Sequence, residues 1–383
     1  MKKNTIANLQ GSKSQIRRKA AIKGLTIGLD LGDRWSCYCV LDAVGEKASE
    51  GKLPTTKGGL DSVFGKMGPC RIALEVGTHS PWVSRHLAEM GYEVIVANAR
   101  KVKLITQSLK KNDRIDAEHL ARLARVDPKL LSPIRHRGKE AQADLAVLRA
   151  RAGLVDVRTE LVNTARGLTK PMGERMKKCD PDYVKEALAD ELSETTQNAI
   201  RPLLKSVEAI NEQIEVYDRK IQEMEKRYPE VELLKQVYGV GSLIAVAFIL
   251  VIEDKERFAQ SRDVGPYLGL TPKQRDSGES SPELRISKAG DPLLRRLLVQ
   301  GAHCMLRKGA PDSDLKAWGM TKLEGSKKGG KKRKKKAVVA VARKLAVLLL
   351  RLWATGEVYD PLYNRKAAAA AKAKAKAKAK VAA

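Results

Sequence analysis

The alternation of apolar and polar residues divides the chain into a strand-rich part followed by a helical part. Four segments with strand character begin after Gly24, and they are residues 25–30, 35–42, 71–77 and 92–99. The first two are separated only by the turn LGDR, which indicates a β-hairpin. Residues 81–91 have the pattern of a helix between two strands. Together these segments predict a mixed α/β domain that ends in a helix beginning near Asp113.

The next part of the chain has helical periodicity. Residues 141–169 are amphipathic, and residues 166–183 form a turn-rich connection. Beyond it, apolar residues recur at alternating spacings of four and three, which predicts a coiled-coil seam. The seam consists of Leu203, Val207, Ile210, Ile214, Tyr217, Ile221 and Met224. It belongs either to an antiparallel hairpin within one chain or to a dimer interface.

A third, mostly helical part begins near Val231. Gly239 and Gly241 precede an apolar helix, an arrangement similar to a helix–hairpin–helix, whose backbone N–H groups can hold a DNA phosphate. A plain tight turn is the alternative interpretation. Within residues 269–303 a loop leads into a helix that Asp291 caps, with Pro292 as its first residue. A last apolar helix, 337–353, follows a run of lysines.

The positive charge is concentrated at the two ends of the chain. The formal net charge is +28; residues 1–23 hold seven Lys/Arg and no acid, and residues 327–383 hold eighteen Lys/Arg against two acids. Basic ends around a nearly balanced body predict a polyanionic partner, most simply nucleic acid. For the Lys/Ala-rich tail, 366–383, a solvated extension is an equal alternative.

The five cysteines form no CxxC pair and have no partnered histidine spacing, which is typical of reduced thiols rather than of a zinc site or a disulfide framework. No apolar run approaches the roughly 20 residues that a membrane span needs. The N-terminus has charge but no hydrophobic signal segment. These features predict a cytoplasmic, nucleoid-associated protein without a membrane partner.

Four carboxylates stand at the ends of predicted elements. Asp30 ends the first strand, Glu75 ends a later strand, and Asp113 and Asp116 are neighbours on one helical face. If they converge, they repel one another unless a cation neutralises them, and Mg²⁺ prefers such oxygen ligands. Such a site polarises a phosphodiester. The alternatives are a capping residue at Asp113, a helix-dipole partner at Asp116 and a turn residue at Asp30.

Three blocks of the sequence, IGLDLG, ALEVG and KNDRIDAEHLARL, resemble the DEDD transposases of bacterial insertion sequences, the IS110 (IS-one-ten) family, and the resemblance extends over about residues 24–360. It implies an RNase H-like (RuvC-like) first domain and an acidic tetrad formed by Asp30, Glu75, Asp113 and Asp116. The residues after Glu75 depart from the usual family pattern. They include His79, which lies either near the metals or in a structural position.

A loop with the sequence KQRDSGESSPELRISKAG carries a candidate nucleophile. Ser277 precedes Gly278, which lets a backbone approach a phosphate closely, and basic residues nearby can clamp that phosphate. A serine hydroxyl needs a base or a metal beside it to attack. From the residues alone an ordinary turn is the stronger interpretation. The family resemblance implies that Ser277 is the nucleophile, with Ser280 and Ser281 as close competitors and Ser287 as a structural residue.

The resemblance implies a DNA transposase that cuts and rejoins DNA through a Mg²⁺-assisted phosphoserine link, guided by a structured non-coding RNA. Its partners would be donor DNA, target DNA, that RNA and further copies of the chain in a dimer or tetramer. The alternatives are a RuvC-type Holliday-junction resolvase or metal-dependent nuclease that uses water, and a non-catalytic scaffold. The residues assigned to nucleic-acid binding are Lys110, Lys111, Arg114, Gly239, Gly241, Arg275, Arg285 and Lys288.

The predicted fold class is therefore α/β plus α. The predicted domains are a basic arm (1–23), a RuvC-like DEDD domain (24–130), a helical coiled-coil region (139–228), a C-terminal serine transposase domain (229–365) and the tail (366–383).

Overall fold

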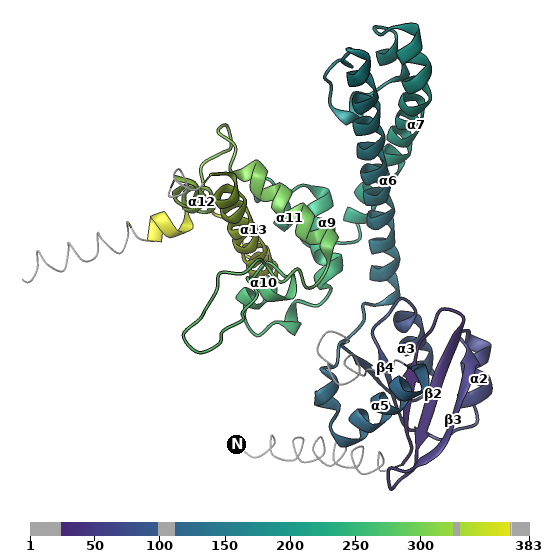
Figure 1. Cartoon of the computed structure of the whole chain (residues 1–383). Coiled ribbons are helices and arrows are strands. Elements are labelled where there is room, and N and C mark those ends of the chain that lie inside the picture. The colour runs from purple at the N-terminus through teal and green to yellow at the C-terminus, as the bar shows by residue number, and fades with distance from the viewer. Residues whose placement is uncertain (1–23, 99–111, 325–329, 368, 370–383) are drawn as a thin grey trace, which may run out of the picture. The chain divides into compact units, whose positions relative to one another are not determined.

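The computed structural model describes residues 24–98, 112–324, 330–367 and 369 (Figure 1). The chain divides into two compact units, residues 1–137 and residues 138–383. The predicted basic arm and Lys110 and Lys111 lie outside the described residues, as does nearly all of the predicted tail. The finer domain boundaries expected from the sequence stay predictions.

The first unit is built on one five-stranded mixed sheet with the strand order β3-β2-β1-β4-β5. The strands are β1 (Thr26–Asp30), β2 (Trp35–Leu41), β3 (Lys47–Pro54), β4 (Arg71–Glu75) and β5 (Glu93–Ala97). β1 pairs with β2 and β2 with β3 in antiparallel fashion, whereas β1 pairs with β4 and β4 with β5 in parallel. The four predicted strands and the first hairpin are confirmed, and β3 was not predicted.

Helices cover both faces of this sheet. They are α2 (Lys57–Phe64), α3 (Ser80–Glu89) and α5 (Asp113–Val126), followed by a short 3₁₀ turn. Side chains such as Leu60 of α2 and Val83 of α3 pack with Ile27 and Leu29 on one face. On the other face α5 packs against β1, β2 and β4, where Ala73 meets Leu120. The first unit is therefore a three-layer α/β/α domain, which confirms the mixed α/β prediction for this part of the chain.

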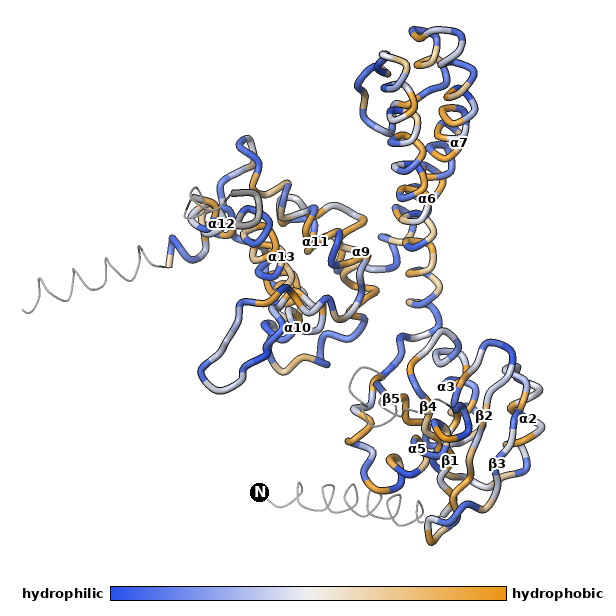
Figure 2. The backbone as a smooth tube through the Cα atoms, in the orientation of Figure 1, coloured by the Kyte–Doolittle hydropathy of each residue, from blue (hydrophilic) through white to orange (hydrophobic). Residues whose placement is uncertain are grey.

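The second unit begins with two long helices that lie side by side, α6 (Lys139–Thr169) and α7 (Glu194–Glu225) (Figure 1). Arg151 of α6 pairs with Asp218 of α7, and Arg158, later in α6, donates to Asn211, earlier in α7, so the two helices run antiparallel. Both helices alternate apolar and polar residues along their length (Figure 2). The hairpin alternative for the predicted seam is therefore the arrangement within this chain.

The predicted seam is correct in most positions but not in all. Val207, Ile214, Ile221 and Met224 are buried. Leu203, Ile210 and Tyr217, however, are only partly buried, and Leu204, adjacent to Leu203, is fully buried instead. A strict heptad drifts around a straight helix, so the face that meets α6 passes from one side chain to its neighbour.

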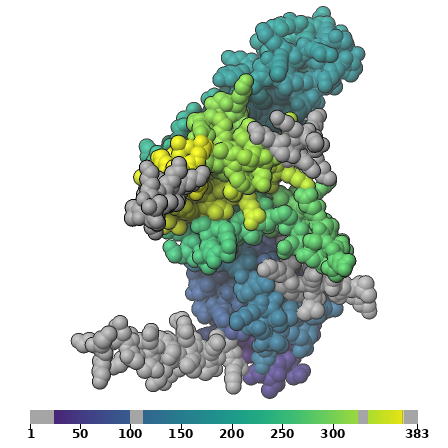
Figure 3. Space-filling model, turned by 90° about the vertical axis from the view of Figure 1, so that its left-hand side faces the viewer, coloured from purple at the N-terminus to yellow at the C-terminus, as the bar shows by residue number. Residues whose placement is uncertain are grey.

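The remaining helices enclose the core of the second unit. They are α8 (Glu230–Lys235), α9 (Ser242–Ile252), α10 (Val264–Tyr267), α11 (Pro292–Met305), α12 (Asp314–Glu324) and α13 (Gly330–Thr355). Every residue of α9 from Ile244 to Ile252 is buried, because α6, α8 and α11 all contact it. In the space-filling view the light-green to yellow C-terminal segments lie against one another (Figure 3). The predicted helix 337–353 lies within α13, and α12 was not predicted.

Asp291 caps α11 as predicted. Its side chain accepts a hydrogen bond from the Leu294 N–H at 3.0 Å, and Pro292 is the first residue of the helix. None of the helices in the described part of the chain combines the length and the apolar character that crossing a bilayer requires.

Candidate active site

Asp30 and Glu75 end two strands that are neighbours in the sheet. β1 and β4 are parallel, and the pairing of Leu29 with Leu74 places the next residues, Asp30 and Glu75, beside each other. Alternate residues of a strand share a face. Ala73 packs against α5, so Glu75, two residues later, lies on that face at the carboxyl end of β4, and Asp30 lies there at the end of β1.

A glycine lets α5 lie directly on β1 at this face. A Cβ atom on Gly28 would stand 1.9 Å from the Ala117 carbonyl oxygen and 2.6 Å from the Ala121 nitrogen. At the other end of the helix, the Arg71 guanidinium at the start of β4 donates to the Ala124 carbonyl oxygen at 2.9 Å. The C-terminal end of α5 therefore lies over the strand starts, and its N-terminal turn lies over the strand ends.

This helix direction brings the paired aspartates to the edge that holds Asp30 and Glu75. α5 begins at Asp113, as predicted, and Asp116 follows one turn later. Asp113 and Asp30 both lie close enough to the Cys37 thiol on β2 to affect its pKa. Burial raises this pKa, and the nearby carboxylates of Asp113 and Asp30 raise it further. The four carboxylates thus belong to one edge and one face of the sheet.

The capping interpretation of Asp113 is wrong. The cap of α5 is Asn112, whose side-chain oxygen accepts a hydrogen bond from the Arg114 N–H at 3.1 Å. Asp113 is consequently exposed in the first turn with its carboxylate available for another role. Asp116 is only 8% exposed, and its Oδ1 is a buried atom for which the described part of the chain supplies no hydrogen-bond partner.

These carboxylates suit a hard divalent cation. Within the described ranges, no three His, Cys, Asp or Glu side chains already form a cluster that could hold a metal ion. The donor set is nevertheless made entirely of carboxylate oxygens, which Mg²⁺ prefers. A buried carboxylate oxygen without a partner is also an unfavourable arrangement that a cation would relieve. The chemistry of these donors therefore suits such an ion, although the described side chains do not form a preformed cluster around it.

The loop after Glu75 is held by contacts that the sequence did not reveal. The Ser80 hydroxyl donates to the Gly77 carbonyl oxygen at 2.8 Å and lies 2.9 Å from Nε2 of His136. Burial lowers the pKa of His136, which favours its neutral form. His136 and Ser80 are 56 residues apart, so no local pattern could have linked them.

His79 has a structural environment. Its Nε2 lies 3.2 Å from the Asp33 carboxylate, and its Nδ1 accepts a hydrogen bond from the Trp82 indole N–H at 3.1 Å. Both ring nitrogens are therefore engaged by protein groups, which agrees with the structural interpretation of this residue.

Ser277 lies at the tip of an exposed hairpin between α10 and α11. The backbones of Ser277 and Ser280 exchange two hydrogen bonds of 3.0 Å, and Gly278 between them has φ +53°. Further back, the Lys273 N–H donates to the Arg285 carbonyl oxygen at 2.9 Å. The turn interpretation of the serine loop is thus correct for its backbone, and it leaves the Ser277 side chain exposed to solvent.

Basic residues surround this hairpin. Arg275 is on the outgoing arm, Arg285 on the returning arm, and Lys288 at the base with φ +55°. The returning arm is tied to the start of α13 by an ion pair of 2.5 Å between Glu283 and Lys336. Ser277 and the three basic residues therefore belong to one loop of the second unit, whereas the four carboxylates belong to the first unit.

The glycine pair before α9 has a clear packing role. Gly239 has φ +85°, and a Cβ atom there would stand 2.8 Å from the Gly301 carbonyl oxygen of α11. Gly241 is exposed immediately before α9, so its N–H side is accessible. A short turn with both glycines joins α8 to α9, and the predicted helix–hairpin–helix likeness and phosphate-binding role of the glycines stay predictions. Arg114 of the first unit, also predicted to bind nucleic acid, is exposed, and its guanidinium lies 3.5 Å from the Glu50 carboxylate.

Comparison with known proteins identifies two matching family models. Residues 27–170 match the transposase model for the DEDD domain of IS110 elements, and residues 231–316 match the model described as the transposase IS116/IS110/IS902 family. The two matches contain the four carboxylates and Ser277, respectively.

Whole-chain relatives agree with these models. The chain is 27% identical to the transposase for insertion sequence element IS1111A of Coxiella burnetii, over 90% of this chain and 93% of the relative. It is 28% identical to a probable family 20 transposase of Pseudomonas aeruginosa, over 78% of this chain and 88% of the relative. It is also 28% identical to the transposase for element IS1328 of Yersinia enterocolitica, over 63% of this chain and 72% of the relative.

Proposed function

The chain belongs to the IS116/IS110/IS902 family of insertion-sequence transposases, and we propose that it recombines DNA through a phosphoserine intermediate at Ser277, assisted by Mg²⁺ and guided by RNA. The observation that carries the metal part of this proposal is the close approach of α5 to Gly28, because it brings Asp113 and Asp116 to the edge of Asp30 and Glu75. The strand order of the sheet supports an RNase H-like assignment for this unit.

In the proposed site, Asp30, Glu75, Asp113 and Asp116 hold the metal. When bound, Mg²⁺ supplies charge that polarises the phosphodiester and lowers the pKa of the attacking hydroxyl. The carboxylates keep their place because α5 is fixed to β1 and capped by Asn112. A rigid scaffold of this kind is what positions reacting groups accurately.

Ser277 is proposed as the nucleophile because its exposed hydroxyl lies at the tip of a hairpin that a DNA backbone can reach. Its oxygen forms a new bond to phosphorus while the bond to one sugar oxygen breaks; serine loses its proton and the leaving sugar oxygen gains one. The product is again a phosphodiester, so its bond energy is retained for rejoining. Arg275, Arg285 and Lys288 are placed to stabilise the phosphate charge.

Nucleic-acid partners follow from the family and from the charge of the chain. The net charge of +28 with only 4% aromatic residues favours backbone contacts over base stacking as the main source of affinity. A guide RNA would supply sequence choice by base pairing and leave the protein to recognise backbone and shape. We propose donor DNA, target DNA and RNA as partners of a dimer or tetramer in which the serine and the carboxylates of one site come from different copies. A DNA substrate accounts for the predicted cytoplasmic, nucleoid-associated location.

The test is a denaturing gel of the purified full chain with Mg²⁺, the non-coding RNA that flanks the element, and DNA carrying the element's junction. A covalent protein–DNA adduct should form, and it should be absent with Ser277→Ala or Asp116→Asn. Ser280→Ala is the matched control, because Ser280 lies opposite Ser277 in the same turn. If the adduct still formed with Ser277→Ala but not with Ser280→Ala, the nucleophile would be Ser280 and the proposal for Ser277 would be wrong.

A resolvase or nuclease that uses water remains the second candidate, because the carboxylate edge of the first unit is sufficient for it. That enzyme would release free nicked DNA, and it would do so equally with Ser277→Ala. Omitting the RNA tests guidance separately, since a protein that reads its own sites would form the adduct without RNA.

A further inference from the structure

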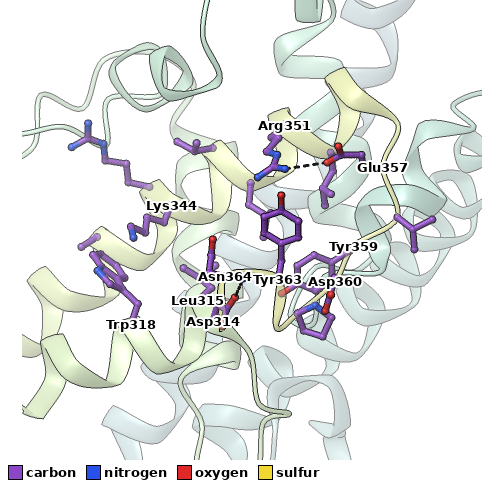
Figure 4. A pocket seen from close by; sticks show the side chains of 17 residues that line it. Asp314, Leu315, Trp318, Lys344, Arg351, Glu357, Tyr359, Asp360, Tyr363 and Asn364 are labelled. Atoms are coloured by element: carbon purple, nitrogen blue, oxygen red, sulfur yellow. Dashed lines mark hydrogen bonds and ion pairs between the residues drawn. The ribbon is translucent and has the colours of Figure 1, made fainter. Parts of the chain in front are cut away.

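The second unit contains a pocket whose lining includes no residue of the serine hairpin. Its volume is about 900 Å³, and it lies between α12, α13 and the segment that follows α13 (Figure 4). That segment is fixed in place, because the Asp314 N–H donates to the Pro361 carbonyl oxygen at 2.7 Å and the Asn364 N–H donates to Asp314 Oδ2 at 2.6 Å. Leu315, Leu348 and other apolar side chains line part of it. The pocket is thus a preformed cavity with an apolar part.

The lining itself holds three cations and three acids, but Arg365 and Lys366, just outside the lining, each pair with one of those acids. Each acid on its wall already has a cationic partner: Glu357 with Arg351 at 3.2 Å, Asp360 with Lys366 at 2.9 Å, and Asp314 with Arg365 at 3.0 Å. By contrast, no ion pair is formed by Arg343 or Lys344 with any of the described residues, although both line the pocket. Two cations are therefore available to an anion.

Lys344 is held in a position that an anion would favour. Its ammonium lies 3.9 Å from the centre of the Trp318 ring, on which Lys322 also lies at 5.7 Å. Burial, and then repulsion by Lys322, lower the pKa of Lys344. A phosphate beside these lysines would relieve that repulsion.

Tyr363 supplies a flat apolar surface in the same pocket. It stands in the middle of the lining residues in Figure 4, and it is 53% exposed. The Arg351 guanidinium lies 5.2 Å from its ring centre. An aromatic ring beside cations suits a nucleotide, whose base stacks on the ring while its phosphate meets the positive charge. An acidic peptide would use the cations but not the ring.

We propose that this pocket binds one unpaired nucleotide of a single-stranded nucleic acid, with its base against Tyr363 and its phosphate at Arg343 and Lys344. The site goes beyond the proposed recombination chemistry, since it involves neither Ser277 nor the four carboxylates. Single-stranded RNA and single-stranded DNA both offer this chemistry, and the experiment separates them.

The experiment uses the full chain with Ser277→Ala, so that no DNA chemistry interferes. Short single-stranded RNA and DNA carry 5-iodouridine or 5-iodo-2′-deoxyuridine at one position, and ultraviolet light crosslinks that base to a neighbouring aromatic residue. Mass spectrometry of the digested protein should find the crosslink on the peptide that contains Tyr363. Fluorescence anisotropy measures the affinity of the same oligonucleotides in parallel.

Two variants test the two halves of the pocket. Tyr363→Leu keeps an apolar side chain but removes the ring, and we expect affinity to fall about fivefold or more, as for one lost stacked base. Its matched control is Tyr183→Leu, because Tyr183 is 73% exposed and outside the pocket. Lys344→Glu is compared with Lys205→Glu on α7, which changes the net charge equally.

Loss of affinity for RNA alone identifies RNA as the occupant, and loss for DNA alone identifies DNA. Crosslinks that map away from Tyr363, or pocket variants that bind as well as their controls, would overturn the proposal. All four positions are on the surface, and circular dichroism checks that each variant is folded. Because Ser277 is already replaced, these results do not depend on whether the phosphoserine proposal holds.

Discussion

Substitution of Gly28 tests both the packing of the first unit and its proposed metal site. Substitution by alanine would place a Cβ atom 1.9 Å from the Ala117 carbonyl oxygen, far inside the ordinary contact distance of at least 3.4 Å. The obstructing atoms belong to the backbone of α5, so no side-chain rotation can relieve the clash. The helix must retreat from β1 by about 1.5 Å, because the interior has no free space to absorb the methyl group.

The size of the effect follows from that displacement. Overpacking a core typically costs about 1–3 kcal/mol, and a clash with rigid backbone belongs at the upper end, about 3 kcal/mol. That is a substantial part of the roughly 5–15 kcal/mol that stabilise an ordinary domain. Retreat of α5 also carries Asp113 and Asp116 away from Asp30 and Glu75. A misplacement of about 1 Å can reduce catalysis about 100-fold, so Gly28→Ala should lose activity well beyond its loss of stability.

Urea denaturation and the covalent-adduct assay measure the two effects. Gly58→Ala in α2 is the matched control: a Cβ atom there meets nothing within 4 Å, and alanine favours a helix by about 1 kcal/mol over glycine. If Gly28→Ala were folded within about 0.5 kcal/mol of the native protein and fully active, the packing of α5 on β1 would not position the carboxylates, and the reasoning would fail.

Three further outcomes are expected. Mg²⁺ should raise the thermal midpoint of the native chain but not that of Asp116→Asn. Without metal, Asp116→Asn should be at least as stable as the native chain, because one repelling charge is gone. An equal response of both proteins to Mg²⁺ would show that Asp116 does not hold the metal. Hydrogen bonds from Lys47 first, and then from Arg122, lower the pKa of Glu118 below its ordinary 4.5. The stabilisation from Glu118 is therefore present above that pH and is lost as the pH falls further. The free energy of unfolding in urea should accordingly change less between neutral and acidic pH in Glu118→Gln than in the native chain, by below about 1 kcal/mol. Asp144 is buried and accepts hydrogen bonds from the Tyr228 hydroxyl at 2.6 Å and from the Arg227 guanidinium at 2.7 Å. Asp144→Ala should therefore destabilise the second unit by about 2 kcal/mol in urea denaturation. An unchanged midpoint would show that these two bonds contribute nothing.

Residue patterns determined the elements whose burial is regular. β1, β2, β4 and β5 each bury a run of apolar residues, α5 begins at Asp113 as predicted, and α11 begins after its predicted cap Asp291. These features are local, because strand alternation, helical periodicity and caps depend on residues within a few positions of one another. The acidic set could be proposed for the same reason, since each carboxylate stands at the end of such an element.

The sequence did not predict the features that depend on pairing with another element. β3 has the sequence KASEGKLP and is mostly exposed, so no apolar alternation marks it. It forms because its backbone pairs along the edge of β2, and Leu53 is its one buried side chain. The exact seam of α7 was likewise decided by its partner: α6 buries Leu204 where the heptad pattern predicts Leu203.

The sequence by itself determined that this chain has an α/β unit, a helical unit, four candidate carboxylates and a serine in a basic loop. Only the tertiary structure decided that Asn112 rather than Asp113 caps α5, that Gly28 admits this helix onto β1, and that Tyr363 shares a pocket with Lys344. The physical reason is tertiary packing in two of these cases and local backbone conformation in the third. For Gly28 and for the pocket, the outcome depends on which backbone or side chain approaches from another element, and close packing fixes that approach. The cap is local, but the sequence offers two adjacent residues that can both cap a helix, and only the backbone conformation decides between them.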